Sequence, residues 1–219
     1  MPPTIPTHSR LLDVAVDHFG RLGLAGASTR AIAKDADTPM SSITYHFGGK
    51  EGLYLATADH IANRMVNRLA PAIAEIQRAC QAGCTRKRAR EALHALFAHF
   101  AAVLVSAETA APARFIIREQ AEPTAAFTRI YERLMFPLLG RVTFLLNIIA
   151  GGRLQQTELR VRAISLVGQI LVFRVARETA LRAAGWKGIG GNEIKSIQSV
   201  VADHLDAIFD RLAKGWKSI

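Results

Sequence analysis

Apolar residues recur every three to four positions along most of the chain, a spacing that places them on one face of an α-helix. The first stripe consists of Leu11, Leu12, Ala15, Val16 and Phe19, and it ends at the glycines of residues 20–23. The same spacing predicts a long helix from Lys50 to about Leu69, and further helices over residues 86–106, 113–121, 124–150, 157–184 and 192–214. Strand patterns are few, so we predict an all-α protein.

Prolines and glycines separate these segments, notably Pro112, Pro123, Gly151 and Gly152. The glycine-rich residues 185–191 predict a turn, after which Asn192 is expected to cap the last helix. Pro137 lies inside a helical pattern and should kink or interrupt it, because its nitrogen has no hydrogen to donate.

Two short helices joined by a tight turn are predicted within residues 28–53. Ser28 can cap the free amides of the first helix, which should end near Ala36. Asp37 then occupies the turn, Thr38 can cap the second helix, and Pro39 suits that helix's first position. This is the layout of a helix-turn-helix, whose second helix enters the major groove of DNA.

The second helix, residues 39–47, has one apolar face and an otherwise small, polar surface. Ile43 and Phe47 lie four residues apart and can hold the apolar face against the protein. The remaining positions are Met40, Ser41, Ser42, Thr44, Tyr45 and His46. Few of these stabilise an isolated helix, whereas base edges and phosphates are partners that suit them. A surface helix without a ligand is the alternative.

The segment Ile43–Tyr54, ITYHFGGKEGLY, resembles the signature of the TetR family of bacterial transcriptional regulators. The stripe before it and the helix that starts at Lys50 also fit that family. Three positions depart from the family pattern: Asp37 stands where glycine is usual, Thr38 where a small apolar residue is usual, and Gly49 where a hydroxyl cap is usual. Aspartate tolerates left-handed backbone angles and glycine can cap a helix, so the motif survives these changes, which bear on fine positioning.

Two further strings, REQAEPTAAF at residues 118–127 and GQILVFRVARET at residues 168–179, resemble the CecR-like branch of that family. The resemblance implies a DNA-binding domain over residues 1–54, whose last helix continues to about residue 70, and an effector-binding and dimerisation domain over residues 55–219. It implies a homodimeric repressor that binds a palindromic double-stranded DNA operator and is released by a small-molecule effector.

The alternatives are a transcriptional activator, a ligand-independent DNA-binding factor, and an enzyme with a helical catalytic domain. The enzyme has little support, because the sequence has no nucleophile elbow, zinc-protease helix motif or nucleotide-binding loop. No catalytic residue is therefore assigned.

Within the helix-turn-helix, DNA-contacting residues are expected in three places. Met40, Ser41, Ser42, Thr44 and Tyr45 face the DNA, His46 and Lys50 contact phosphates, and Ser28, Thr29 and Arg30 hold the DNA backbone beside the preceding helix. Lys50 suits a phosphate doubly, because its charge and the amides at the helix start both attract an anion. The alternative for Tyr45 and His46 is packing against the first helix.

The distribution of charge weakens one apparent argument for DNA binding. The chain has a net charge of +10, but residues 1–70 hold 7 basic and 6 acidic residues, a net charge of only +1. The argument must therefore rest on local placement. The densest basic cluster, residues 86–90, opposes the dipole of the helix that it starts. We expect it to be a solvated helix start or an auxiliary contact for an anion.

Candidate effector-binding residues combine aromatic walls with polar groups, as small-molecule cavities do. They are Phe115, Arg118, Glu119, Gln120, Phe127, Tyr131, Gln169, Phe173, Arg174 and Glu178. Arg118 with Glu119, and Arg174 with Glu178, could instead be internal ion pairs.

The last two predicted helices carry broader apolar stripes than one chain's core requires. Their members are Ile164, Val167, Leu171, Val175, Ile197, Val200, Val201, Leu205, Ile208, Phe209 and Leu212. In the resembled family this helix pair packs against its twofold mate as a four-helix bundle, so we expect a homodimer. The alternative is that both stripes serve only the core of one chain.

No metal or cofactor is expected. Cys80 and Cys84 lie four residues apart without further ligands beside them in the sequence, so they are expected to be reduced thiols. The longest strongly apolar stretch, Val142–Ala150, is too short to span a bilayer, and the chain starts without a hydrophobic signal region. We therefore expect a cytoplasmic protein with no membrane partner.

Overall fold

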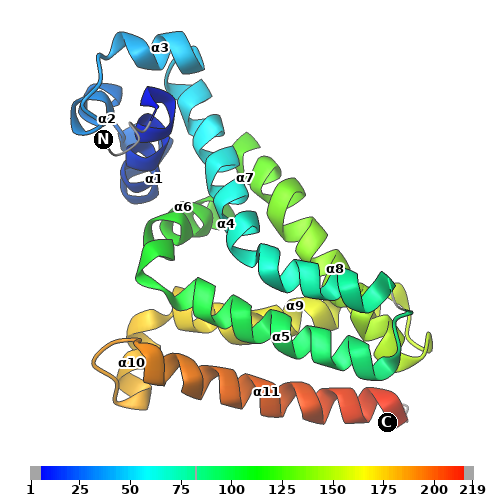
Figure 1. The fold of residues 1–219 in the computed structure, drawn as a ribbon. Helices are drawn as coiled ribbons and strands as arrows, with labels where there is room; N and C mark the ends of the chain where they lie inside the picture. The colour runs from blue at the N-terminus through cyan, green and yellow to red at the C-terminus, as the bar shows by residue number, and fades with distance from the viewer. Residues whose placement is uncertain (1–5, 82, 215–219) are drawn as a thin grey trace, which may run out of the picture. The chain divides into compact units, whose positions relative to one another are not determined.

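The computed structural model describes residues 6–81 and 83–214, and these residues are helical with no strand among them (Figure 1). The elements are α1 (Thr7–Gly26), α2 (Thr29–Asp35), α3 (Ser41–Phe47), α4 (Lys50–Gln81), α5 (Arg86–Val105), the 3₁₀-helix η1 (Ala107–Thr109), α6 (Ala110–Ala121), α7 (Ala125–Ile130), the π-helix η2 (Tyr131–Met135), α8 (Phe136–Ala150), α9 (Gln156–Val175), α10 (Arg177–Ala184) and α11 (Gly191–Lys214). The predicted all-α fold class is confirmed.

These helices pack as two units. The helix-turn-helix unit comprises Met1–Val66 and Glu108–Met135, and the larger unit comprises Asn67–Ala107 and Phe136–Ile219. This division does not coincide with the boundary expected near residue 54, because α6 packs against α1 and α7 packs against α6. Gly20 of α1 allows the close approach of α6, since a Cβ at that position would lie only 3.1 Å from the carbonyl oxygen of Ala111.

Each unit has its own apolar core. In the helix-turn-helix unit the predicted stripe of α1 is buried together with residues from α2, α3, α4 and α6; among these buried residues are Leu11, Phe19, Ile32, Ile43, Leu53, Ile61 and Phe115. In the larger unit α5, α8, α9 and α11 pack together, and their buried residues include Leu93, Phe97, Leu145, Ile149, Ile170, Leu205 and Phe209. The first of these cores is the platform that holds the helix-turn-helix.

The predicted end of the fourth helix is wrong. Helix α4 does not end near Leu69 but continues through Pro71 to Gln81. Ala72 and Ile76 on its next turns are 5% and 3% exposed, so burial of the later turns compensates for the hydrogen bond that Pro71 cannot donate. Packing here outweighs a local helix breaker.

The predicted single helix over residues 157–184 is interrupted at Ala176, whose φ and ψ angles are −103° and 42°. Alanine is a strong helix former, so the sequence contains no local signal for this break. The interruption predicted at Pro137 is confirmed, because the π-helix Tyr131–Met135 lies just before it. The wider turn accommodates a residue that cannot complete the regular ladder.

The start of α11 differs from the prediction that Asn192 caps it. The helix begins at Gly191, and the backbone amide of Gly190 donates to the Glu193 carboxylate at 2.8 Å. The amide of Ile194 donates to the carbonyl of Gly190 at 3.0 Å, which makes Gly190 the capping residue. Glu193 therefore supplies the side chain of the cap by reaching back one turn.

One helical stretch, Ala125–Ala150, is long and apolar enough by composition alone to cross a membrane. A buried core helix passes the same test. Its apolar face is used inside the protein, since Val142, Leu145, Leu146 and Ile149 are all fully buried. Phe136 and Phe144 on the same stretch are 60% and 50% exposed, so one side of it lies in the core and another side is open.

Candidate DNA-binding interface

Helix α2 is built as the capping signals predicted. The Ser28 hydroxyl accepts a hydrogen bond from the amide of Ala31 at 3.4 Å, and the helix ends at Asp35. Ile32 is fully buried, whereas Arg30 and Lys34 are exposed and lie four residues apart. That spacing places both cations on one face of α2. Lys34 was not among the predicted DNA-binding residues, although its spacing from Arg30 was a signal for it.

The turn after α2 contains Asp37, which has a φ of 50° and is the one non-glycine residue with a positive φ among the described residues. Thr38 does not cap α3 as predicted. Its hydroxyl instead donates back to the carbonyl of Ala33 at 3.4 Å, and no side chain caps α3. The first turn of α3 is closed by backbone bonds, including one from the amide of Ser42 to the carbonyl of Pro39 at 3.0 Å.

Helix α3 is anchored on one face and open on the other. Ile43 is 2% exposed, and the half-buried Phe47 ring stacks on His8 of α1 with centroids 4.9 Å apart. Met40 is 52% exposed and Tyr45 is 85% exposed. Ser41, Thr44 and His46 are also exposed, while Ser42 is half-buried. An anchored helix with an exposed, small and polar outer face suits insertion into a groove.

Tyr45 and His46 differ in their contacts with α1. The Tyr45 ring contacts the edge of His46, with centroids 5.0 Å apart, and extends into solvent. The His46 ring also meets His8 of α1 edge-on at 5.9 Å. The alternative that these residues pack against α1 therefore applies in part to His46, whereas Tyr45 remains available to a ligand.

The connection between α3 and α4 depends on glycine. Gly48 takes left-handed angles, and its amide donates to the carbonyl of Thr44 at 2.9 Å. A Cβ on Gly52 would lie 1.7 Å from the carbonyl oxygen of Phe47, a distance that no side chain can occupy. Gly52 thus fixes how closely α4 approaches the end of α3. Lys50 donates from Nζ to the carbonyl of Ala25 at 3.0 Å, which leaves two ammonium hydrogens for an anion.

Two histidine–aspartate contacts join α1 to the neighbouring helices. Nε2 of the buried His18 lies 2.8 Å from Oδ2 of Asp35, at the end of α2. Nε2 of His60 on α4 lies 2.9 Å from Oδ1 of Asp13, and Arg64 donates to the same oxygen at 2.7 Å. A carboxylate can only accept, so each imidazole donates. These contacts fix the orientation of the motif on its platform.

A buried carboxylate joins α4, α6 and α7 within the helix-turn-helix unit. Glu119 is 1% exposed, and its Oε1 accepts from the Tyr54 hydroxyl at 2.5 Å. Its Oε2 accepts from the amides of Thr124 and Phe127, both at 3.0 Å, and from the Thr124 hydroxyl at 2.9 Å. Burial, followed by the bond to Glu119, raises the pKa of Tyr54 well above its ordinary value, so its hydroxyl remains a donor.

The predicted effector residues are divided between the two units. Phe115, Arg118, Glu119, Gln120, Phe127 and Tyr131 belong to the helix-turn-helix unit, whereas Gln169, Phe173, Arg174 and Glu178 belong to the larger unit. Several have protein partners. Arg118 donates to the carbonyl of Arg21 at 3.1 Å, and Arg174 donates to the carbonyls of Leu104 and Ser106 at 2.7 and 2.5 Å.

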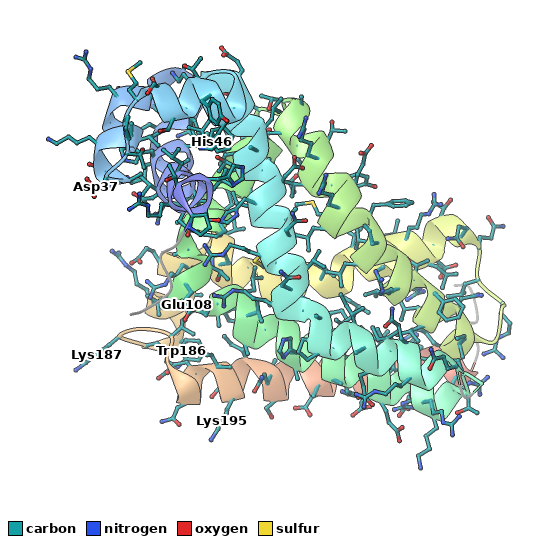
Figure 2. All side chains as sticks on the ribbon, turned by 45° about the horizontal axis from the view of Figure 1, so that its top comes forward. Asp37, His46, Glu108, Trp186, Lys187 and Lys195 are labelled. Carbon is teal, nitrogen blue, oxygen red and sulfur yellow. The ribbon has the colours of Figure 1, made fainter. Side chains whose placement is uncertain are left out.

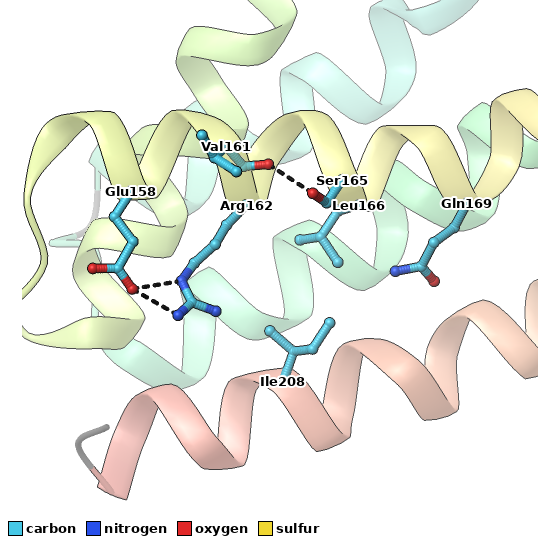
Figure 3. Close-up of a pocket in the computed structure, with 7 residues that line it drawn as sticks. All are labelled: Glu158, Val161, Arg162, Ser165, Leu166, Gln169 and Ile208. Atoms are coloured by element: carbon cyan, nitrogen blue, oxygen red, sulfur yellow. Dashed lines mark hydrogen bonds and ion pairs between the residues drawn. The ribbon is translucent and has the colours of Figure 1, made fainter. Parts of the chain in front are cut away.

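The larger unit has a groove of about 310 Å³ between α9 and α11 (Figure 3). Its lining residues are Glu158, Val161, Arg162, Ser165, Leu166, Gln169 and Ile208. Arg162 donates to Glu158 at 2.6 and 3.1 Å along one wall. Gln169 is the predicted effector residue that lines this groove, and its amide oxygen lies 3.0 Å from Nδ1 of His204.

The apolar stripes of the last two long helices have different surroundings. On α11, five of the predicted residues are at most 4% exposed and belong to the core of the chain itself: Ile197, Val201, Leu205, Phe209 and Leu212. On α9, Ile164 and Val175 are 58% and 59% exposed, and Val161 and Val172 lie on the same open side. Helix α9 therefore has one apolar face in the core and another in solvent.

The basic cluster at residues 86–90 is partly explained by contacts within the larger unit. Thr85 caps α5 by accepting from the amide of Arg88, and Arg90 donates to Asp206 and Asp210 of α11 at 2.9 and 2.6 Å. These bonds raise the pKa of Arg90 and lower that of Asp206.

No group of three potential metal ligands occurs among the described residues. The side chain of Cys80 lies outside the described part.

Comparisons with known proteins agree with this geometry. Residues 11–57 match the family model of bacterial regulatory proteins of the tetR family, and residues 89–211 match that of the C-terminal domain of the HTH-type transcriptional dual regulator CecR. The HTH-type transcriptional dual regulator CecR of Shigella flexneri is 32% identical over 206 residues, which cover 94% of this chain and 92% of that protein.

Solved structures share the fold. A transcriptional regulator from Pseudomonas aeruginosa PAO1 is 18% identical with a TM-score of 0.70, and the match covers 94% of this chain and 92% of that one. AibR, in complex with isovaleryl coenzyme A and operator DNA, is 14% identical with a TM-score of 0.67 and coverages of 91% and 97%.

The matched relatives are transcriptional regulators rather than enzymes, and one of them covers nearly the whole chain. The anchored and exposed α3 supplies the feature that such a regulator needs. The chain belongs to the TetR family of bacterial transcriptional regulators and carries the C-terminal domain of the CecR dual regulators.

Proposed function

We propose that this regulator is a cytoplasmic repressor that binds a palindromic operator as a homodimer and is released by a small-molecule effector. The observation that carries the DNA-binding part is α3, which Ile43 anchors while Tyr45 stays 85% exposed. One such short helix contacts few bases. Two copies held about 34–36 Å apart would read both halves of a palindrome.

The ten predicted DNA-binding residues divide by role. Met40, Ser41, Ser42, Thr44 and Tyr45 face base edges and sugars, while Ser28, Thr29, Arg30, His46 and Lys50 hold the DNA backbone. The exposed Lys34 joins Arg30 as a second cation on α2. Lys50 serves two partners, because its bond to Ala25 uses one ammonium hydrogen and places the charge at the start of α4.

The homodimer is proposed on the solvent-facing side of α9. Val161, Ile164, Val172 and Val175 are between 48% and 59% exposed, and Leu171 is 37% exposed. A second apolar face on a helix that already contributes to the core suits burial against another copy. Val200 of α11, which is 51% exposed, extends the same kind of surface. The expected contribution of α11 to the dimer is therefore smaller, because most of its apolar stripe is buried in the core of its own chain.

An effector is supported by AibR, a structure of the same fold that holds isovaleryl coenzyme A together with operator DNA. The ten predicted effector residues remain candidates for a ligand that binds the arrangement unable to hold the operator. A thermal-shift screen of acyl-coenzyme A esters and other small metabolites would identify it, because a ligand that binds the folded state raises the melting temperature.

The test of DNA binding is a gel shift at several salt concentrations, with a duplex taken from the region upstream of the gene. Lys50→Ala should weaken binding to all sequences and reduce the salt slope by about 1, whereas Thr44→Ala should change which sequences are preferred. Lys195→Ala on α11 removes the same charge from the larger unit and serves as the matched control. Unchanged binding in Lys50→Ala would remove the phosphate contact proposed for Lys50, and unchanged binding in Tyr45→Phe would remove the DNA contact proposed for the Tyr45 hydroxyl.

A second candidate is regulation in both directions. The relative that covers 94% of this chain is described as a dual regulator, and the DNA-binding surface is equally compatible with repression and activation. The outcome depends on where the operator lies relative to each promoter. Reporter fusions to the bound promoters, with and without the gene, would separate these functions by the sign of the change.

A further inference from the structure

Asp37 is the one aspartate of the helix-turn-helix unit without a basic partner among the described residues. The other four each lie within ion-pair distance of one: Asp13 with His60 and Arg64, Asp17 with Arg21 and Arg114, Asp35 with His18, and Asp59 with Arg129 and Arg133. Those carboxylates support the packing of helices. The exposed carboxylate of Asp37 has no such role.

Local structure gives no reason for an acid at this position. Asp37 has a φ of 50°, an angle that glycine adopts with less strain. Its side chain caps neither neighbouring helix, and the contact of Asp37 with Arg10 uses the backbone carbonyl, at 3.5 Å. On stability alone, glycine would be the better residue. The fold therefore leaves the carboxylate available to a partner outside it.

Its position places it beside the surface that contacts DNA. Asp37 lies in the turn between α2, which carries the exposed Arg30 and Lys34, and α3, which begins at Ser41 (Figure 2). A negative charge within about 10 Å of phosphates repels them through water at moderate salt. Residues 1–70 have a net charge of only +1, so removal of one carboxylate would double the net charge of this segment.

We infer that Asp37 is an affinity-setting residue, whose carboxylate repels the DNA backbone and holds binding below the level that the same scaffold could reach. The repulsion acts on every sequence alike, so it suppresses non-specific binding and makes residence on DNA depend on the base contacts of α3. This inference rests on the DNA-binding surface proposed above. It predicts that removal of the charge strengthens binding, which is the opposite of what loss of a contact residue does.

The experiment compares Asp37→Asn with the wild-type protein on the upstream duplex and on a shuffled duplex of the same length. Asparagine keeps the size and tolerates left-handed angles, so it isolates the charge. Affinity for both duplexes should rise about threefold per subunit at low salt, and the gain should shrink as salt is added. Asp203→Asn, an exposed acid of α11 in the larger unit, should leave both affinities unchanged.

Three outcomes would overturn the inference. Unchanged affinity in Asp37→Asn would show that the carboxylate does not act on DNA, and a loss confined to the upstream duplex would make Asp37 a base-reading residue. Asp37→Gly, a further variant, relieves the backbone strain as well as removing the charge. If Asp37→Gly raised affinity and Asp37→Asn did not, backbone strain would be the cause. Because the shuffled duplex binds through charge alone, the comparison of Asp37→Asn with the wild-type protein on that duplex is valid even if the upstream region contains no operator. An upstream duplex that binds no better than the shuffled duplex would count separately against the proposed repressor.

Discussion

The buried Glu119 carboxylate makes a sharp prediction about how the helix-turn-helix is held. Four donors surround it: the Tyr54 hydroxyl at 2.5 Å, the Thr124 amide at 3.0 Å, the Thr124 hydroxyl at 2.9 Å, and the Phe127 amide at 3.0 Å. Every partner has a hydrogen to donate, so both carboxylate oxygens act as acceptors. Two of these donors are amides at the start of α7, so Glu119 satisfies backbone groups that have no partner within that helix.

Tyr54→Phe deletes one charge-assisted bond and leaves Oε1 without its donor, which should cost about 1.5–3 kcal/mol of unfolding free energy. Glu119→Ala leaves two amides and a buried hydroxyl unpaired and opens a cavity, so about 3–5 kcal/mol is expected. Glu119→Gln should lie between wild type and alanine, because the amide oxygen can keep the bonds to Thr124 and Phe127 while its NH₂ group donates to Tyr54.

Urea unfolding followed by far-ultraviolet circular dichroism measures these differences. Tyr45→Phe is the matched control, because it removes a hydroxyl from a tyrosine that is 85% exposed and should leave stability unchanged. The raised pKa of Tyr54 adds a test by pH. Its contribution is complete below about pH 10, the ordinary pKa of tyrosine, and is lost as the pH rises further and the unfolded chain ionises first. A Tyr54→Phe protein as stable as Tyr45→Phe would refute the role of the network.

Three other predictions follow from the packing. Gly52→Ala should displace α4 from α3, lower stability by about 1–3 kcal/mol and reduce DNA binding in a gel shift, whereas Gly140→Ala, where a Cβ meets nothing, should not. Ile164→Asp should shift a dimer to a monomer in sedimentation without loss of helical signal; an unchanged sedimentation coefficient would contradict the proposed interface. The lowered pKa of Asp206 means that its bond to Arg90 stabilises the fold above about pH 4 and weakens as the pH falls. Since Asp206 is exposed, Asp206→Asn should lower the free energy of unfolding by less than about 1 kcal/mol, as measured by unfolding series at acid and at neutral pH.

Local signals were sufficient for the regular parts of the fold. The Ser28 cap, the end of α2 and the turn at Asp37 were each predicted from one or two residues, because capping and left-handed angles depend on few atoms. The stripe of α1 was predicted from its spacing and is buried. The break before Pro137 followed from the missing donor.

Three features of the structure were not predictable from local sequence: the extension of α4, the break at Ala176 and the bond from Lys50 to Ala25. Burial of Ala72 and Ile76 carries α4 past Pro71, and nothing in the local sequence of α9 marks the break at Ala176. For the interface, the exposed positions of α3 were predictable from the turn and from spacing. The bond from Lys50 to Ala25 was not, because it joins residues that the fold brings together from the ends of two helices.

The effector residues show why a mixture of charged and aromatic side chains is ambiguous in a chain of many short helices. Each helix end leaves amides or carbonyls without partners, and charged side chains can satisfy them. Glu119 does this at the start of α7, and Arg174 does it for the carbonyls of Leu104 and Ser106 at the end of α5. A pocket and a set of capped helix ends therefore have the same composition. An effector that uses either charge must first replace the bonds that the residue already makes, so binding there would loosen a helix end. At Glu119 such a change would act on the start of α7 and, through the Tyr54 hydroxyl, on α4, the helix that follows α3.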